Sequence, residues 1–258
     1  MTRALLFDCD GVLADTERDG HLVAFNRMWQ DEGVDWQWST DQYARKVKIG
    51  GGKERMASLR DDRAFRAVFD VPSSDRAWWE IVRGWHTKKS AIYKELIASG
   101  ALPPRPGVRR LAQAAHEAGW TLAVCSTSAV ASVEAVLRHV MGQALAGRFA
   151  GIFAGDMVKA KKPAPDVYTA AVDKLRLDPA ACLVVEDSRN GLLAARGAQM
   201  RCLVTYNDLT KDENFEEAAA VVSDLGDPQT APITVAANRS GAQLGAYITI
   251  EDLEQMLS

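Results

Sequence analysis

Short apolar runs rich in β-branched residues alternate with helical patterns along much of this chain, and this alternation restricts the fold more than any other property of the sequence. Between most of the runs, apolar residues recur with helical spacing, as in 108–119 and 165–177. Strands that alternate with helices form parallel sheets covered on both faces, so we predict an α/β fold with a Rossmann-like parallel-sheet core. The expected strands are 4–7, 121–126, 151–156, 181–187 and 200–206, with a weaker one at 218–225.

The alternation is interrupted from about residue 16 to residue 100. This interval holds six of the seven tryptophans, many charges and no convincing strand, and its helical patterns include 21–33 and 41–49. The prolines and Gly107 of 102–107 mark the return to the α/β pattern. We therefore predict a core made of 1–15 and 101–258, with a helical insertion at 16–100 in which most of the tryptophans form a small core of their own.

Composition excludes several classes of function. The net charge of −3 provides no overall field that would attract nucleic acid or a membrane surface, and no apolar run approaches the roughly 20 residues that span a bilayer. The four cysteines lie in or beside strand-like runs without zinc spacing, which indicates buried thiols in a reducing compartment. The first residues lead directly into a strand, so we expect no signal or transit peptide in this sequence. We predict a soluble monomer that binds neither nucleic acid nor membrane.

Reactive side chains follow several predicted strands at their carboxyl ends, where open α/β sheets bind ligands. Asp8 and Asp10 follow the first strand, and Glu186 and Asp187 end the fourth run. The hydroxyl-bearing and basic residues at these ends are Ser126, Thr127 and Ser128 after the second run, and Lys159, Lys161 and Lys162 after the third.

Each of these sets has an ordinary explanation when taken alone. Asp-x-Asp is a common pattern, Ser-Thr-Ser before a helix is usually an N-cap, and a lysine pair before proline is usually a solvated loop. Together, four acids at one sheet edge require a cation, and an all-oxygen ligand set suits Mg²⁺. A hydroxyl at a helix start with a lysine beside it favours an anion. The combination predicts phosphoryl transfer.

Four motifs in order give the chain a family resemblance: D-x-D-G-V at 8–12, the strand-terminal Ser126, K-K-P-x-P-D at 161–166 and E-D-S-x-x-G at 186–191. They resemble the haloacid dehalogenase-like superfamily over 1–15 and about 101–225. The position of the insertion is similar to that of the subgroup with a helical cap domain, which implies that 16–100 governs substrate specificity.

The resemblance implies a role for each core residue. Asp8 would be the nucleophile that forms an aspartyl-phosphate, and Asp10 the general acid and base. Asp8, the Asp10 carbonyl and Asp187 would hold Mg²⁺, with Glu186 close by. Ser126 and Lys162 would bind the transferring phosphoryl group. A dehalogenase is disfavoured, because that branch lacks the second aspartate.

The segment KIGGGKERM at 48–56 is the most informative part of the insertion. Its three glycines are unfavourable within a helix and are followed by Lys53 and Arg55, which predicts a clamp for an anion; a flexible turn is the alternative. It is no Walker A loop, because Glu54 stands where Ser or Thr is required.

Two further pairs of residues in the insertion are candidates for binding the substrate. His86 and Lys89 are three residues apart and so share one face of a helix, where they could form a second binding site; a solvated helix face is the alternative. Glu17 and His21 are expected to meet substrate hydroxyls, with a structural role as the alternative.

The stretch from Glu17 through GGGKERM to HTKK at 86–89, with AVCSTS at 123–128, resembles CbbY-type proteins of carbon-fixing organisms, which are similar in architecture to β-phosphoglucomutases. That family selectively hydrolyses xylulose 1,5-bisphosphate, an inhibitor of Rubisco. Relative to some bacterial members, 17–21 has one extra residue, which affects the contact of His21. The likeness to plastid forms implies a chloroplast stroma; without it we expect the cytoplasm. The implied substrate contacts are Glu17, His21, Gly51, Gly52, Lys53, Glu54, Arg55, His86, Lys89 and the loop 126–132, which includes Thr127 and Ser128.

The leading hypothesis is thus a Mg²⁺-dependent phosphatase that acts on a sugar bisphosphate, namely xylulose 1,5-bisphosphate. A phosphosugar mutase of the β-phosphoglucomutase type would use the same core residues and is the alternative. A non-catalytic phosphosugar-binding protein is a second alternative, disfavoured because it need not retain both a nucleophile and an acid.

Overall fold

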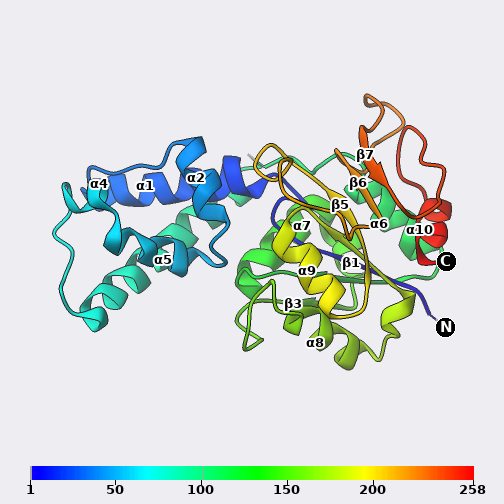
Figure 1. The fold of residues 1–258 in the computed structure, drawn as a ribbon, viewed down its shortest axis with the longest axis horizontal. Coiled ribbons are helices and arrows are strands. Elements are labelled where there is room, and N and C mark those ends of the chain that lie inside the picture. Colours follow the sequence, from blue (N-terminus) through cyan, green and yellow to red (C-terminus); the bar gives the residue numbers. More distant parts are fainter. Residues whose placement is uncertain (1, 101) are drawn as a thin grey trace. The chain divides into compact units, whose positions relative to one another are not determined.

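The computed structural model describes residues 2–100 and 102–258, which form two compact units. One unit combines the chain up to Asp15 with Pro103–Ser258, and the other is the uninterrupted segment Thr16–Leu102. Figure 1 shows the elements of both. Among the described residues, no helix is long and apolar enough to cross a membrane.

A seven-stranded sheet with the order β3-β2-β1-β4-β5-β6-β7 forms the centre of the larger unit. The first six strands are parallel, which confirms the predicted α/β fold, and β7 pairs antiparallel to β6. The six predicted runs each contain one strand. β7 was not predicted, because its residues are largely exposed and form no apolar run. The strands are β1 (Ala4–Phe7), β2 (Thr121–Cys125), β3 (Gly151–Phe153), β4 (Cys182–Glu186), β5 (Arg201–Thr205), β6 (Ala220–Val222) and β7 (Val235–Asn238).

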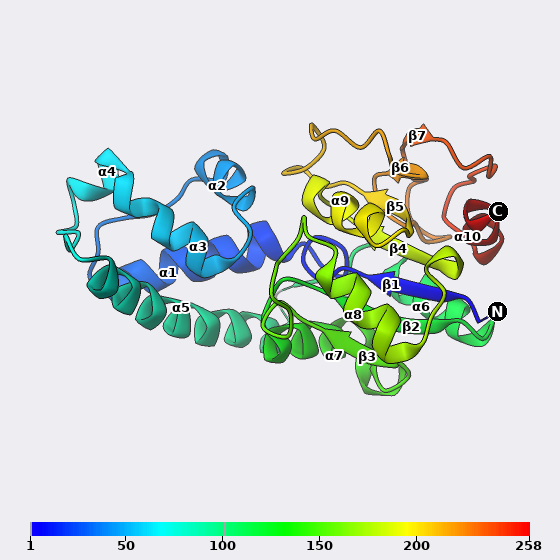
Figure 2. The ribbon, with the colours of Figure 1, turned by 60° about the horizontal axis from the view of Figure 1, so that its bottom comes forward.

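Helices cover both faces of this sheet (Figure 2). Alternate residues of β1, Ala4 and Leu6, belong to the same buried cluster as Val167, Tyr168 and Leu192 of α8 and α9. Because successive strand residues point to opposite faces, Leu5 and Phe7 face the other side, where α6, α7 and α10 lie. The helices are α6 (Val108–Glu117), α7 (Val130–Ala146), α8 (Asp166–Leu175), the short 3₁₀ turn η3 (Pro179–Ala181), α9 (Arg189–Gly197) and α10 (Ile250–Leu257).

The segment Thr16–Leu102 is helical, and none of its described residues belongs to a strand. Its core is aromatic: Trp29 packs edge-on against Trp38 with ring centroids 4.7 Å apart, and Trp78 packs edge-on against Trp85 at 5.8 Å. All four rings are buried, as expected for a small core built from tryptophan. Its elements are the π-helix η1 (Glu17–Leu22), α1 (Val23–Asp31), α2 (Thr40–Val47), α3 (Gly52–Ala57), the 3₁₀ turn η2 (Ser58–Asp61), α4 (Arg63–Arg66) and α5 (Asp75–Ala98).

Candidate active site

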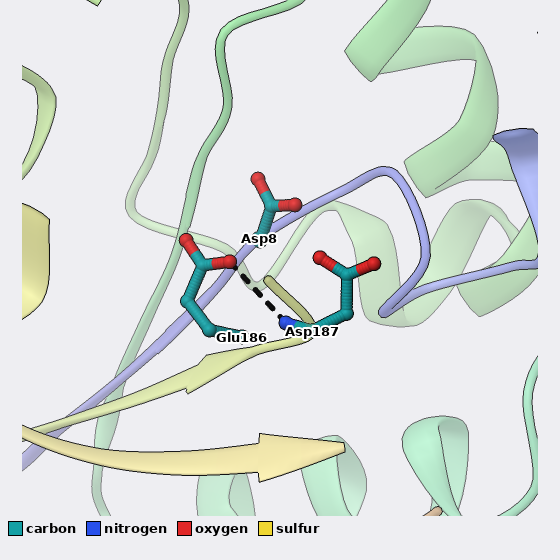
Figure 3. Close-up of side chains that lie close together, drawn as sticks. All are labelled: Asp8, Glu186 and Asp187. Atoms are coloured by element: carbon teal, nitrogen blue, oxygen red, sulfur yellow. Dashed lines mark hydrogen bonds between the residues drawn. The ribbon is translucent and has the colours of Figure 1, made fainter. Parts of the chain in front are cut away.

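Three acidic side chains meet where the neighbouring strands β1 and β4 end. Phe7 is in register with Val185, so Asp8 comes to lie beside Glu186 and Asp187. One carboxylate oxygen of each of the three lies within 4.8 Å of the others, and all three residues are buried (Figure 3). The parallel register of two central strands therefore brings together acids that are almost 180 residues apart in sequence.

Lys162 binds two of these three acids. Its Nζ donates to Asp8 Oδ1 at 2.6 Å and to Glu186 Oε1 at 2.6 Å, and a third bond goes to the carbonyl of Cys125 at 2.8 Å. Tyr168 of α8 donates its hydroxyl to the same Glu186 oxygen at 2.5 Å. The lysine is buried, and all three donor positions of its ammonium group are used within the site.

The electrostatics of the acidic cluster call for more positive charge than Lys162 supplies. Burial, Glu186 and Asp10 raise the pKa of Asp8 to about 8, although Lys162 opposes the shift. Burial lowers the pKa of Lys162, but Asp8 and Glu186 outweigh it and raise that pKa above its ordinary value, so the lysine stays protonated. A buried carboxylate whose pKa is raised by other carboxylates marks a place where a divalent cation would be stabilised. The oxygen-only donor set fits a hard cation.

Two glycines leave the space that the acids occupy. A Cβ on Gly11, where φ is +78°, would lie 2.1 Å from Asp187 Oδ2, and a Cβ on Gly191 would lie 1.9 Å from the Glu186 carboxyl carbon. Any larger residue would displace these carboxylates. This explains physically why Gly follows the two aspartates after β1 and why Gly ends the E-D-S-x-x-G motif.

Ser128, in the loop after β2, forms a hydrogen bond to the second aspartate, Asp10. Ser128 donates its hydroxyl to Asp10 Oδ2 at 2.5 Å, and its backbone N–H donates to Ser126 Oγ at 3.1 Å. The Thr127 carbonyl lies against Gly155, where a Cβ would approach to 2.2 Å. The predicted core residues Asp8, Asp10, Ser126, Glu186 and Asp187 thus end or follow neighbouring strands, and the loop after β3 brings Lys162 to them. Ser128 contacts Asp10 directly.

In the helical unit, Glu17 and Arg55 bind each other. The guanidinium makes two bonds to the carboxylate, at 2.9 Å and 3.1 Å, and a third to the hydroxyl of Tyr43 at 2.7 Å; Tyr43 in turn donates to Glu17. Arg55 is buried, whereas Lys53 is exposed. Of the two cations expected to form the anion clamp, one is therefore already paired with a carboxylate, and only Lys53 faces solvent.

His21 and Lys89 also meet within this unit. Their side-chain nitrogens, Nδ1 and Nζ, lie 2.6 Å apart, and the imidazole stacks on Tyr93 with ring centroids 4.0 Å apart. The Lys89 ammonium lies over the rings of Phe25 and Tyr93, at 4.7 Å and 4.9 Å from their centroids. Lys89 is buried, so the alternative of a solvated helix face does not apply to it.

His86 lies beside the glycine run. A Cβ on Gly52 would be 3.1 Å from His86 Nε2, and burial, with Lys89 and Lys53 adding to it, lowers the pKa of His86 to about 4. Gly51 has φ of +98°, a backbone conformation that favours glycine, and α3 begins at the next residue. Half-buried Glu54 favours the protonated form of His86.

The segment 17–21, expected to carry one extra residue, forms the π-helix η1. A π-turn contains one residue more per hydrogen-bonded ring than an α-turn, so it accommodates an inserted residue within a helix. Gly20 is required inside it, because a Cβ there would lie 2.8 Å from the Tyr93 ring.

Three residues of the site were not identified from the sequence. Tyr168 reaches Glu186 from α8, and Asn207 donates to Asp187. Arg105 is buried and donates to the carbonyls of Gly11 and Tyr206, both at 2.8 Å. In the sequence, Arg105 could have been noticed as a lone arginine between prolines, and Asn207 as a polar residue just after β5. Nothing in the sequence around Tyr168 distinguished that residue.

Comparison with known proteins agrees with this geometry. The family model for haloacid dehalogenase-like hydrolases matches residues 2–199. A CBBY-like protein of Arabidopsis thaliana is 43% identical over 225 residues, which cover 87% of this chain and 70% of that protein. The plasmid-encoded protein CbbY of Cupriavidus necator is 41% identical over 226 residues, 88% of this chain and 87% of its own.

Solved structures lead to the same family. CbbY from Rhodobacter sphaeroides in complex with phosphate superposes with a TM-score of 0.77 at 37% identity, over 87% of this chain and 95% of that one. A mutant of the same protein in complex with xylulose-(1,5)bisphosphate has a TM-score of 0.77 at 36% identity over the same shares. The chain therefore belongs to the haloacid dehalogenase-like hydrolases and, within them, to the CbbY-type proteins.

Proposed function

We propose that this protein is a Mg²⁺-dependent phosphatase that removes phosphate from a sugar bisphosphate, namely xylulose 1,5-bisphosphate. The observation that carries the proposal is the buried contact of Lys162 with Asp8 and Glu186, beside Asp187 and near Asp10. The proposed nucleophile, a lysine ammonium group and the acidic side chains that would bind a metal occur together there, as phosphoryl transfer requires. The structure of a CbbY relative with xylulose-(1,5)bisphosphate supports the choice of substrate.

The core residues divide the reaction between them. A carboxylate oxygen of Asp8 attacks the phosphorus and displaces the sugar oxygen, which gives an aspartyl-phosphate. Asp10 donates its proton to that leaving oxygen and then accepts one from the water that hydrolyses the intermediate, so its protonation state is restored. Ser126 and Lys162, which would exchange one of its three present bonds, bind the transferring phosphoryl group. Ser128 keeps the Asp10 carboxylate in place through its 2.5 Å bond.

A divalent cation would be held by Asp8, the Asp10 carbonyl and Asp187, with Glu186 close by, and when bound it would offset the charge of the phosphoryl oxygens. The three carboxylates and the raised pKa of Asp8 support this assignment.

The helical unit would select the substrate. Exposed Lys53 is the cation best suited to meet a second phosphate, while His86, Lys89 and His21 form a basic group of side chains within the same unit. Glu17, Gly51, Gly52, Glu54, Arg55 and Thr127 complete the proposed set of substrate contacts. The relation to a plant CBBY-like protein supports placing the protein in a plastid.

Replacement of the nucleophile tests this function. Asp8→Asn should lower phosphate release from xylulose 1,5-bisphosphate by about 10³-fold or more, because an amide oxygen is a poor nucleophile. Phosphate release would be followed over a panel of sugar phosphates with Mg²⁺, and circular dichroism would check the fold. Activity retained by a pure Asp8→Asn protein would refute the role of Asp8. Phosphosugar isomers in place of free phosphate would show a mutase.

A further inference from the structure

Asn207 lies at the edge of the acidic cluster without a role in the chemistry described above. It stands two residues beyond the end of β5 (Arg201–Thr205), the neighbour of β4 in the sheet, which brings it beside Asp187. Its amide Nδ2 donates to Asp187 Oδ2 at 2.8 Å. A third strand of the sheet, after β1 and β4, thus provides a side chain to the carboxylate proposed as a cation ligand.

The orientation of this amide is set by the turn in which Asn207 sits. Its Oδ1 accepts from the backbone N–H of Leu209 at 2.9 Å, and its own N–H donates to Thr210 Oγ1 at 3.1 Å. Its carbonyl accepts from the N–H groups of Thr210 and Lys211 at 3.1 Å and 2.9 Å. Rotating the amide by half a turn would place its NH2 donor against the Leu209 N–H and its oxygen against the Asp187 carboxylate, so both hydrogen bonds would be lost. The donor is therefore held towards Asp187.

Gly11 lies against the same Asp187 oxygen that Asn207 binds. A Cβ at Gly11 would lie 2.1 Å from Asp187 Oδ2 and 3.0 Å from Asn207 Nδ2, so backbone, carboxylate and amide are in close contact. Arg105 fixes that backbone by donating to the Gly11 carbonyl at 2.8 Å. Asp187 is only 5% exposed, and its carboxylate has little freedom to rotate once Asn207 is bound.

We propose that Asn207 is a positioning residue that fixes the Asp187 carboxylate for binding a divalent cation. The proposal rests on the proposed function, which supplies the cation. A hydrogen bond to a ligating carboxylate limits its rotation before the cation arrives, and loss of such an outer contact weakens metal binding by about 10- to 100-fold. Asn207 itself is not a ligand in this proposal.

The chain offers a matched control in the next turn. Asn214 is exposed, and its Oδ1 accepts from the backbone N–H of Glu216 at 3.0 Å, the same turn bond that Asn207 makes to Leu209. Asn207→Ala and Asn214→Ala therefore remove equivalent turn bonds, but only the first removes the donor to Asp187. Asn207→Asp and Asn214→Asp retain the turn acceptor, and only the first places a second carboxylate against Asp187.

Mg²⁺ binding to the metal-free proteins would be measured by titration calorimetry. Asn207→Ala should weaken binding about 10- to 100-fold, and Asn214→Ala should leave it as in the wild type. In steady-state assays the Mg²⁺ concentration for half-maximal rate should rise by the same factor. The KM for the sugar phosphate should change little, and kcat should recover at saturating Mg²⁺, which a general structural defect would not allow.

Thermal unfolding of the aspartate variants provides a second measurement that needs no activity. Metal-free Asn207→Asp should melt several degrees below Asn214→Asp, because two carboxylates would face each other in a buried place. Equal Mg²⁺ affinities for Asn207→Ala and wild type, or equal melting temperatures for the two aspartate variants, would overturn the proposal. Failure of the wild type to bind Mg²⁺ or release phosphate would instead refute the proposed function.

Discussion

Lys162 shows how one side chain can satisfy several requirements of a buried acidic site. It neutralises part of the charge of Asp8 and Glu186, and its bond to the Cys125 carbonyl ties the segment before α8 to the end of β2. A buried ammonium would be unfavourable without these partners, and the carboxylates would repel each other without the ammonium. The acids and the lysine therefore depend on one another, which a count of charges in the sequence does not reveal.

His86 provides a prediction about protonation. Its pKa of about 4, against an ordinary value of 6.5, results first from burial and then from Lys89 and Lys53. Because the unfolded chain binds the proton more readily, this group should reduce stability as pH falls from about 6.5 to 4 and should have no such effect above that range. An NMR titration, with His86→Gln to assign the resonance, should show no protonation until below about pH 5. A midpoint near 6.5 would contradict the prediction.

At the scale of single elements, one glycine of α9 and one glycine of α5 have opposite surroundings. Gly191 of α9 is packed against the Glu186 carboxyl, whereas a Cβ on Gly84 of α5 would meet nothing within 4 Å. The same amino acid is required for space at one position and is only a helix-weakening residue at the other.

Exchanging each glycine for alanine should therefore have opposite effects. Gly191→Ala should destabilise the protein by about 1–3 kcal/mol, as overpacking does, and should lower activity by displacing Glu186. Gly84→Ala should stabilise it by up to about 1 kcal/mol, because alanine favours the helix. Urea unfolding followed by circular dichroism would measure both. Equal changes in the free energy of unfolding would show that the contact with Glu186 has no energetic weight.

The strands and the core site could be predicted from sequence because their signals are local. The residues proposed to perform the chemistry end or directly follow the buried apolar runs of β1, β2 and β4, and parallel pairing brings those ends together. The pairing of Glu17 with Arg55 could not be predicted, since it depends on how η1 and α3 pack. Asn207 was missed because its role depends on the sheet order, which places β5 next to β4.

At the scale of the whole molecule, Lys53 and Arg55 belong to the same short segment but have different surroundings. Lys53 is exposed, whereas Arg55 is buried against Glu17 and Tyr43. Replacing each residue in turn would therefore test two roles separately: binding of a distal phosphate, expected of Lys53, and stabilisation of the helical unit, expected of Arg55.

Lys53→Ala should raise KM for xylulose 1,5-bisphosphate about tenfold, which corresponds to a loss of roughly 1.4 kcal/mol, with little change for a small aryl phosphate and none in melting temperature. Arg55→Ala should also raise KM for the bisphosphate but should lower the melting temperature, because it leaves the Glu17 carboxylate without its cation. Steady-state kinetics with both substrates and thermal unfolding would be measured together. Equal effects on the two substrates would mean that neither residue recognises a distal phosphate.

The position of β1 in the sheet has a consequence for synthesis of the protein on the ribosome. β1 is made first but lies between β2 and β4, whose residues begin at Thr121 and Cys182. At about 5–20 residues per second, on the order of ten seconds pass before the first of these neighbours is made. Meanwhile Thr16–Leu102 is complete as one uninterrupted segment. The nascent chain therefore carries the apolar strand β1 without its neighbours in the sheet while the residues of the helical unit are already complete.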